Sequence, residues 1–152
     1  TYCVGGGAQN YQPPLQLNEA LALLRQNAGE WHILPDKIAI CGFSAGGHLA
    51  LSGAVLDIPG ETAQQRPNAV ILGYPVVTAG EFAHRGSFVQ LAGSEDAAAQ
   101  QAFTLEDKVT SDKGAHGTSI STAEVDAADP HRAHWVALCL EWLGETFGFK
   151  LS

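Results

Sequence analysis

The chain has 152 residues, of which 45% are hydrophobic and 16% charged; this is enough for one domain with a buried core and excludes a disordered tail. The 16 acidic and 8 basic residues give a net charge of -8, which argues against a nucleic-acid partner because phosphate binding needs clustered Lys and Arg. No apolar run approaches the ~18 residues of a membrane span, and residues 1–10 show no signal peptide, so we expect a soluble protein without a membrane partner.

The N-terminal part predicts the end of a strand followed by a helix. Tyr2–Val4 is β-prone and is interrupted by Gly5–Gly7. From Leu15 to Ala28 the apolar residues recur at intervals of three and four, which is the period of an amphipathic helix. The sequence contains no internal repeat and no linker, so we expect residues 1–152 to form a single domain.

A strand, a helix and a second strand are predicted next. Lys37–Cys41 is a nearly continuous apolar run, typical of a strand buried on both faces of a parallel sheet. His48–Leu56 is compatible with a helix, and Ala69–Tyr74 predicts another buried strand, which Pro75 ends. This order predicts βαβ winding, and hence an α/β fold with a mostly parallel sheet flanked by helices.

The C-terminal half is less clearly patterned until its last segment. Helical tendency is visible around Ala97–Phe103, and Thr110–Ser119 has the composition of a loop. Asp129 and Pro130 suit the N-cap and the first position of a helix. The apolar residues of the segment 135–143 then fall on one face, which predicts a closing amphipathic helix.

The cysteines and histidines predict neither a metal nor a cofactor. The chain has three cysteines, an odd number, and none shows CxxC spacing: Cys3, Cys41 and Cys139. This argues against a disulfide framework and against a zinc site. It favours a reducing, cytoplasmic location. His131 and His134 are spaced as neighbours on a helix. No third ligand accompanies them, so we expect a solvated helix start there.

The most specific feature is a GxSxG pattern at residues 42–46, between a predicted strand and a predicted helix. On such a sharp strand-to-helix turn a serine can act as a nucleophile, here Ser44. We attribute the glycines at positions 42 and 46 to a lack of space, since side chains there would collide with the neighbouring strand and helix. The N–H of Ala45, at the positive end of the helix, is the first candidate to stabilise an oxyanion. An incidental serine in a Gly-rich turn is the alternative.

The longer string GFSAGGHLA, at residues 42–50, resembles the central segment of α/β-hydrolase esterases of the bacterial acetyl-xylan-esterase and acetylesterase type. Other segments are similar in the same order: residues 72–76 to the family's next strand, 91–93 to its middle loop, 114–117 to the loop of its catalytic histidine, and 135–143 to its last helix. The resemblance implies an α/β-hydrolase fold and hydrolysis of small acyl esters, such as acetylated sugars, through an acyl-enzyme.

A serine hydroxyl needs a base to take its proton, and His116 is the best candidate. It follows Ser44 in the order that this fold uses and lies in a Gly-flanked loop. A solvent-exposed loop histidine is the alternative. We expect His48 to pack or to support the site, whereas His32 and His84 carry no interpretable signal.

Two parts of the resembled pattern are absent. Only residues 110–115 separate Val109 from His116, whereas a crossover through a helix needs at least about 10 residues. The segment that carries the catalytic Asp in the family is therefore missing. Asp107 and Asp112 are the nearest preceding acids, and Asp112 is no more than a guess for the role.

The early oxyanion loop of the family, an HGGG-like motif, is the second missing part. Only 43 residues precede Ser44, and no His precedes Gly5–Gly7, which we interpret as a mimic in a loop. The sequence also contains no Met and starts at Thr1, so we expect that its start is processed or missing. The predicted domain is thus an incomplete α/β-hydrolase domain.

Three functional hypotheses follow. The first is a serine carboxylesterase for small esters, with Ser44 as nucleophile, His116 as general base and acid, and the Ala45 N–H as oxyanion donor. The second is a catalytically impaired remnant that serves as a binding or dimerising module, since exposed edge strands would favour self-association. The third is a peptidase or acyltransferase similar to prolyl oligopeptidases, which share the same turn.

Overall fold

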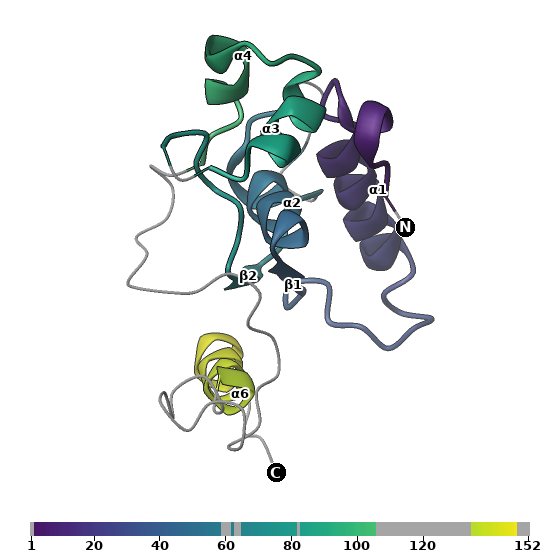
Figure 1. Ribbon diagram of the computed structural model, residues 1–152. Helices are drawn as coiled ribbons and strands as arrows, with labels where there is room; N and C mark the ends of the chain where they lie inside the picture. Colours follow the sequence, from purple (N-terminus) through teal and green to yellow (C-terminus); the bar gives the residue numbers. More distant parts are fainter. Residues whose placement is uncertain (1, 59–61, 63–64, 82, 106–134, 149–152) are drawn as a thin grey trace. The chain divides into compact units, whose positions relative to one another are not determined.

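A computed structural model describes residues 2–58, 62, 65–81, 83–105 and 135–148 (Figure 1). The chain forms two compact units, Thr1–Gly114 and Ala115–Ser152. The prediction of a single domain for residues 1–152 therefore stays a prediction. The elements of the first unit are η1 (Gly5–Ala8), α1 (Gln12–Gln26), β1 (Ala39–Phe43), α2 (Ala45–Val55), β2 (Ala69–Gly73), α3 (Arg85–Ala92) and α4 (Ala97–Gln101).

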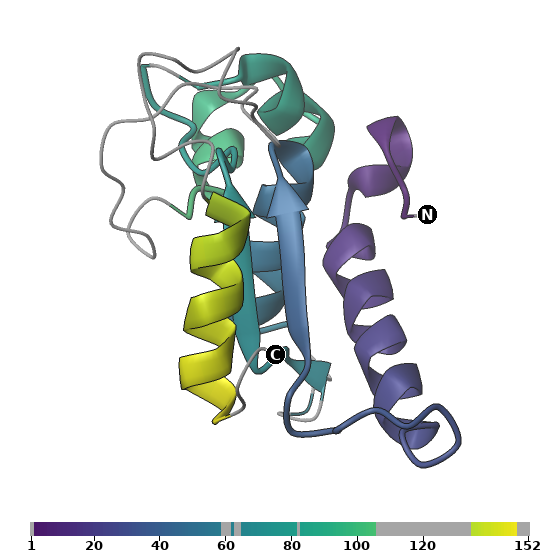
Figure 2. The same ribbon diagram turned by 90° about the horizontal axis from the view of Figure 1, so that it is seen from below.

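The two strands form a parallel sheet with a helix between them in sequence. β1 pairs with β2 in a register that runs from Ala39 opposite Ala69 to Phe43 opposite Gly73. Parallel neighbours need a crossover connection, which α2 provides. α2 packs against both strands, and α1 packs against α2, so the helices α1 and α2 stand beside the sheet (Figure 2). The predicted βαβ winding and the parallel sheet are confirmed.

The predicted bounds shift toward the turn between β1 and α2. β1 begins two residues later than predicted because the chain around Lys37 forms a turn, in which the Lys37 N–H donates to Leu34 O at 3.0 Å. It then extends through Phe43, and α2 begins at Ala45 instead of His48. Cys41, in the middle of β1, is exposed, so the expectation of a strand buried on both faces was wrong for this residue.

Two further segments, Tyr2–Val4 and α3, differ from the prediction. Tyr2–Val4 forms no strand, and the Cys3 N–H instead donates to the side chain of Gln16 at 2.9 Å. α3 was not predicted, and the residues expected in a middle loop, Leu91 and Ala92, form its last turn. Gly93 follows in the left-handed conformation with φ 65°, as is common after a helix.

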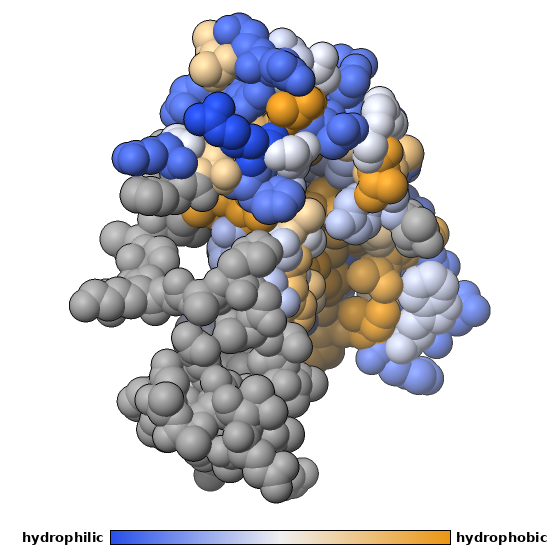
Figure 3. Space-filling view, in the orientation of Figure 1, coloured by the Kyte–Doolittle hydropathy of each residue, from blue (hydrophilic) through white to orange (hydrophobic). Residues whose placement is uncertain are grey.

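The core of the first unit includes buried residues of α1, α2 and α3. Leu21 of α1 and Phe88 of α3 are almost completely buried, with exposed fractions of 1% and 0%. His48 of α2 is also buried, and its ring packs edge-on against the Phe88 ring, with the ring centroids 5.9 Å apart. On the face drawn in Figure 3, hydrophilic side chains dominate over α4 and apolar ones reach the surface beside α1. Burial of apolar side chains from these helices thus stabilises the unit.

The turn between β1 and α2 leaves no room for side chains at two glycines. A Cβ at Gly42 would lie 2.1 Å from the carbonyl oxygen of Gly46, and a Cβ at Gly47 would lie 2.8 Å from the Cβ of Pro75. A Cβ at Gly46 would meet nothing within 4 Å. The expectation that a side chain at Gly46 would collide was therefore wrong, because it is the backbone of Gly46 that approaches Gly42.

The second unit contains helix α6, Trp135–Phe147. It confirms the closing helix predicted from the apolar pattern of residues 135–143. Asp129 and Pro130, the predicted N-cap and first helical residue, lie outside the described residues, as does the predicted loop Thr110–Ser119.

The close approach at Gly42 predicts a sharp difference between two Gly→Ala substitutions. We expect Gly42→Ala to lower the free energy of unfolding by about 3 kcal/mol or more, because the backbone must move to admit the methyl group. The matched control, Gly46→Ala, should be neutral or stabilise by up to about 1 kcal/mol, since alanine favours a helix. Urea denaturation of both variants checks this, and equal losses would contradict the geometry.

The burial of His48 predicts a pH dependence of stability. Burial lowers the pKa of His48 from 6.5, and the hydrogen bond to the backbone of Val76 opposes this in part. Because the folded pKa lies below the unfolded one, the contribution of His48 is present above about pH 6.5 and is lost as the pH falls below that value. We expect the stability gap between the parent and His48→Gln to shrink from pH 7 to pH 5 in urea denaturation. His32→Gln is the control, and a gap that widens would disprove the assignment.

Candidate active site

Ser44 occupies the single position between β1 and α2, in a backbone conformation that L-residues rarely adopt. Its φ is 53° and its ψ is -119°. Such a conformation costs on the order of 1–3 kcal/mol and persists only where the surroundings hold it. It places the Ser44 side chain on a sharp bend instead of in a strand or a helix. The predicted strand-turn-helix arrangement around the serine is thus observed.

Three backbone hydrogen bonds hold this conformation. The Ser44 N–H donates to Gly73 O of β2 at 3.0 Å, and the Ser44 carbonyl accepts from the N–H groups of His48 at 3.1 Å and Val76 at 3.2 Å. Ser44 is therefore tied to the neighbouring strand, to its own helix and to the loop after β2. Tyr74, just after β2, also has a positive φ, of 36°. Both strands end in strained residues at the same edge of the sheet.

Ala45 is the first residue of α2 and is exposed. The N–H groups of the first helical turn have no partner within their helix and lie at its positive end. The first backbone bond of α2 is the one from the His48 N–H to Ser44 O. The Ala45 N–H precedes the first donor of these helical hydrogen bonds and lies directly after the strained Ser44 in the chain.

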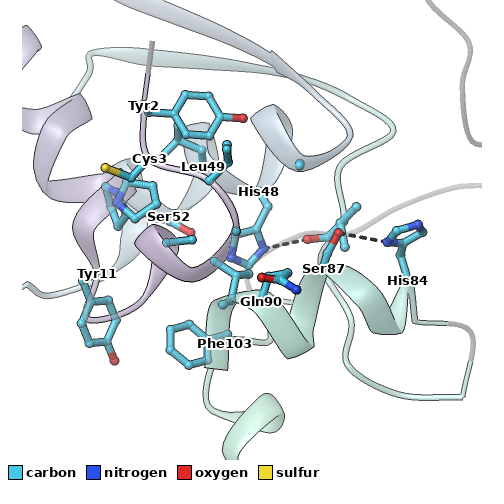
Figure 4. A pocket seen from close by; sticks show the side chains of 18 of the residues that line it. Tyr2, Cys3, Tyr11, His48, Leu49, Ser52, His84, Ser87, Gln90 and Phe103 are labelled. Atoms are coloured by element: carbon cyan, nitrogen blue, oxygen red, sulfur yellow. Dashed lines mark hydrogen bonds between the residues drawn. The ribbon is translucent and has the colours of Figure 1, made fainter. Parts of the chain in front are cut away.

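A pocket of about 340 Å³ opens beside this turn. Its wall is formed by the N-terminal segment through η1, the start of α1, one side of α2 and the side of α3, and Ala45 belongs to the lining (Figure 4). His84 and Ser87 also line it, and His84 Nδ1 lies 2.9 Å from Ser87 Oγ. Neither the pocket nor the place of His84 in it could be predicted from the sequence, because the pocket wall combines segments that are far apart in the chain.

The predicted site residues are only partly placed. Ser44 and Ala45 lie next to each other in the turn, whereas His116, Asp107 and Asp112 lie outside the described residues. His48 is buried with an exposed fraction of 6%, and its Nδ1 donates to Val76 O at 2.7 Å, so it supports the turn from behind. This agrees with its expected packing role.

The described part of the chain contains neither a candidate metal site nor a candidate membrane-spanning helix. Among the described residues no group of three or more His, Cys, Asp or Glu side chains could hold a metal ion. His131 and His134 lie outside these residues. None of the helices that the structure describes is long and apolar enough to cross a bilayer.

Sequence comparison finds one family and two enzymes. The BD-FAE family model matches residues 14–130. The chain is 35% identical over 111 residues to endo-1,4-beta-xylanase B of Butyrivibrio fibrisolvens, and 36% identical over 84 residues to an acetylxylan esterase of Xylanibacter ruminicola. The matched parts cover 64% and 55% of this chain and 17% of each enzyme. The chain thus spans about a sixth of the length of these curated relatives.

Solved structures with a similar fold are α/β hydrolases. MGS-M1, an alpha/beta hydrolase from a Medee basin deep-sea metagenome library, is 26% identical with a TM-score of 0.58, and the match covers 91% of this chain and 66% of MGS-M1. An acetyl ester-xyloside bifunctional hydrolase from Caldicellulosiruptor lactoaceticus shares the fold, with 24% identity, a TM-score of 0.59 and coverage of 93% and 68%. From the family match over residues 14–130 and this structural likeness, the chain belongs to the BD-FAE family and has the α/β-hydrolase fold.

Proposed function

We propose that the chain carries part of the active site of a serine esterase, with Ser44 as nucleophile, His116 as general base and acid, and the Ala45 N–H as an oxyanion donor. The observation that carries the proposal is the strained backbone of Ser44 on a bend between a strand and a helix. Three hydrogen bonds stabilise this conformation, and serine nucleophiles of α/β hydrolases occupy such a turn. Membership in the BD-FAE family supports the same assignment.

The proposed reaction has two steps. His116 takes the proton of Ser44 Oγ while the oxygen attacks the ester carbonyl carbon, and the negative charge that forms on the carbonyl oxygen is stabilised by the Ala45 N–H. The tetrahedral intermediate expels the alcohol, which receives the proton from His116, and the acyl group stays on Ser44. Water then attacks the acyl-enzyme by the same route and releases the acid.

The proposed substrates are small acyl esters, such as acetylated sugars. Support comes from the similarity to an acetylxylan esterase over 84 residues and to an endo-1,4-beta-xylanase over 111 residues. The pocket beside Ala45 agrees with a neutral ester, because no Lys, Arg, Asp or Glu is among the described residues that line it. A charged substrate would lose hydration there without gaining an ionic partner.

A catalytically impaired remnant is the second candidate. Its support is the short segment between Val109 and His116, which leaves no room for the family's crossover to a catalytic Asp. Among the described residues the sheet has two strands, β1 and β2. Exposed strand edges would favour a binding or dimerising role for such a remnant.

The serine assignment predicts covalent labelling. A fluorophosphonate probe should add its phosphonyl group to Ser44 Oγ, with loss of fluoride, and the intact mass should rise by one adduct. We expect no adduct on Ser44→Ala or on the denatured chain, whereas Ser94→Ala should label like the parent. A folded parent chain that stays unlabelled would contradict the active-esterase proposal and favour the remnant.

The base assignment predicts a change in labelling rate. We expect His116→Gln to slow the reaction of Ser44 with the probe by about 10²–10⁴-fold, which is the usual contribution of a general base. His32→Gln is the matched control and should react at the parent rate. Asp112→Asn tests the acid: a loss similar to that of His116→Gln would assign Asp112 to the role, and an unchanged rate would remove it. If His116→Gln reacts at the parent rate, His116 is not the base.

A further inference from the structure

The pocket continues along α2, away from Ser44. The α2 residues that line it are Ala45, His48, Leu49, Ser52 and Leu56 at the C-cap. These positions recur at intervals of three and four and therefore form one stripe on the side of the helix. The space is thus a pocket between helices whose inner end is distant from the strained serine.

The described residues that line the pocket are mainly apolar, and none of them is Lys, Arg, Asp or Glu. Aromatic rings of Tyr11 and Phe103 lie on one side, with centroids 5.6 Å apart, and Leu49 and Val76 add aliphatic surface. Since the described part of the lining offers no ionic partner, a charged ligand would lose hydration there without compensation. A neutral ligand with a large apolar part fits this lining. The volume of about 340 Å³ equals that of about eleven water molecules in the liquid, enough for a ligand with one ring.

Two buried polar groups of α2 break this apolar lining. Ser52 has an exposed fraction of 2%, and its Oγ has no hydrogen-bond partner among the described residues. A buried hydroxyl without a hydrogen-bond partner is destabilising. A ligand that forms a hydrogen bond with Ser52 Oγ would remove this cost and would therefore bind more tightly. His48 lies one turn earlier on the same stripe. Its Nδ1 must carry the hydrogen because it faces the carbonyl of Val76, which leaves Nε2 as an acceptor in the neutral ring.

We propose that this pocket binds a neutral, mostly apolar alcohol whose hydroxyl group bonds to Ser52 and His48. Side chains one turn apart on a helix have Cβ atoms about 5–6 Å apart, so one hydroxyl oxygen can bridge them. The ligand hydroxyl would accept from Ser52 Oγ and donate to His48 Nε2, while its apolar part contacts Tyr11 and Phe103 (Figure 4). The ester proposal draws on the same pocket, but this binding needs neither Ser44 nor His116, so a failure of covalent labelling at Ser44 would leave it standing.

An NMR titration of the intact chain tests the proposal with three matched probes. Benzyl alcohol is the expected ligand, toluene lacks the hydroxyl, and benzoate carries a charge. We expect benzyl alcohol to shift the backbone amide signals of Leu49, Ser52 and Leu91 in a saturable way. Toluene should bind about tenfold more weakly, because it leaves the Ser52 hydroxyl without a partner, and benzoate should not bind.

Ser52→Ala separates the hydroxyl contact from general apolar binding. We expect this variant to bind benzyl alcohol about tenfold more weakly than the parent does and to bind toluene at least as well. Ser94→Ala, outside the pocket, is the control and should behave like the parent. Ser52→Cys, which keeps the volume, gives the same test if the alanine variant does not fold. Equal affinity for alcohol and toluene, no effect of Ser52 substitution, or shifts confined to residues outside the pocket would each overturn the proposal.

Discussion

The tie between the backbone of Ser44 and the neighbouring strand is the constraint on which the rest of the first unit depends. The hydrogen bond from the Ser44 N–H to Gly73 O continues the parallel pairing by one residue beyond the sheet. The Ser44 carbonyl accepts hydrogen bonds from His48 in α2 and from Val76 in the loop after β2. One residue thus joins the strand, the helix and the next strand. The strain at Ser44 is maintained because relaxation would break bonds to three different segments at once.

Both sides of α2 contact other parts of the first unit. One side packs against β1 and β2 and fixes the direction in which the helix leaves the turn. The other side contacts α1 and lines the pocket with His48 and Ser52. Since the chain provides the turn and the pocket from one helix, displacement of α2 would change both. The buried bond between His48 and Val76 limits such displacement from the pocket side.

The sequence predicted the elements that have strong local patterns. The period of α1, the apolar runs of β1 and β2 and the apolar face of α6 each follow from residues that are close in the chain. α3 was missed, since its burial depends on the contact of Phe88 with His48 of another helix. The turn at Ser44 was predicted from its motif, but the crowding at Gly47 comes from Pro75, which no local pattern includes. Contacts between distant segments, the pocket among them, therefore had to come from the structure.

The contact between Gly47 and Pro75 also bears on how this sequence can change. A Cβ at position 47 would lie 2.8 Å from Pro75 Cβ and 3.0 Å from its Cα. Because part of that contact is with backbone, trimming the proline ring alone would not make enough room for a larger residue at 47. The two positions therefore cannot drift independently, and a tolerated side chain at 47 requires the loop after β2 to be rebuilt at the same time. We therefore expect a substitution at position 47, in α2, to be accepted only together with a change in the loop that carries Pro75.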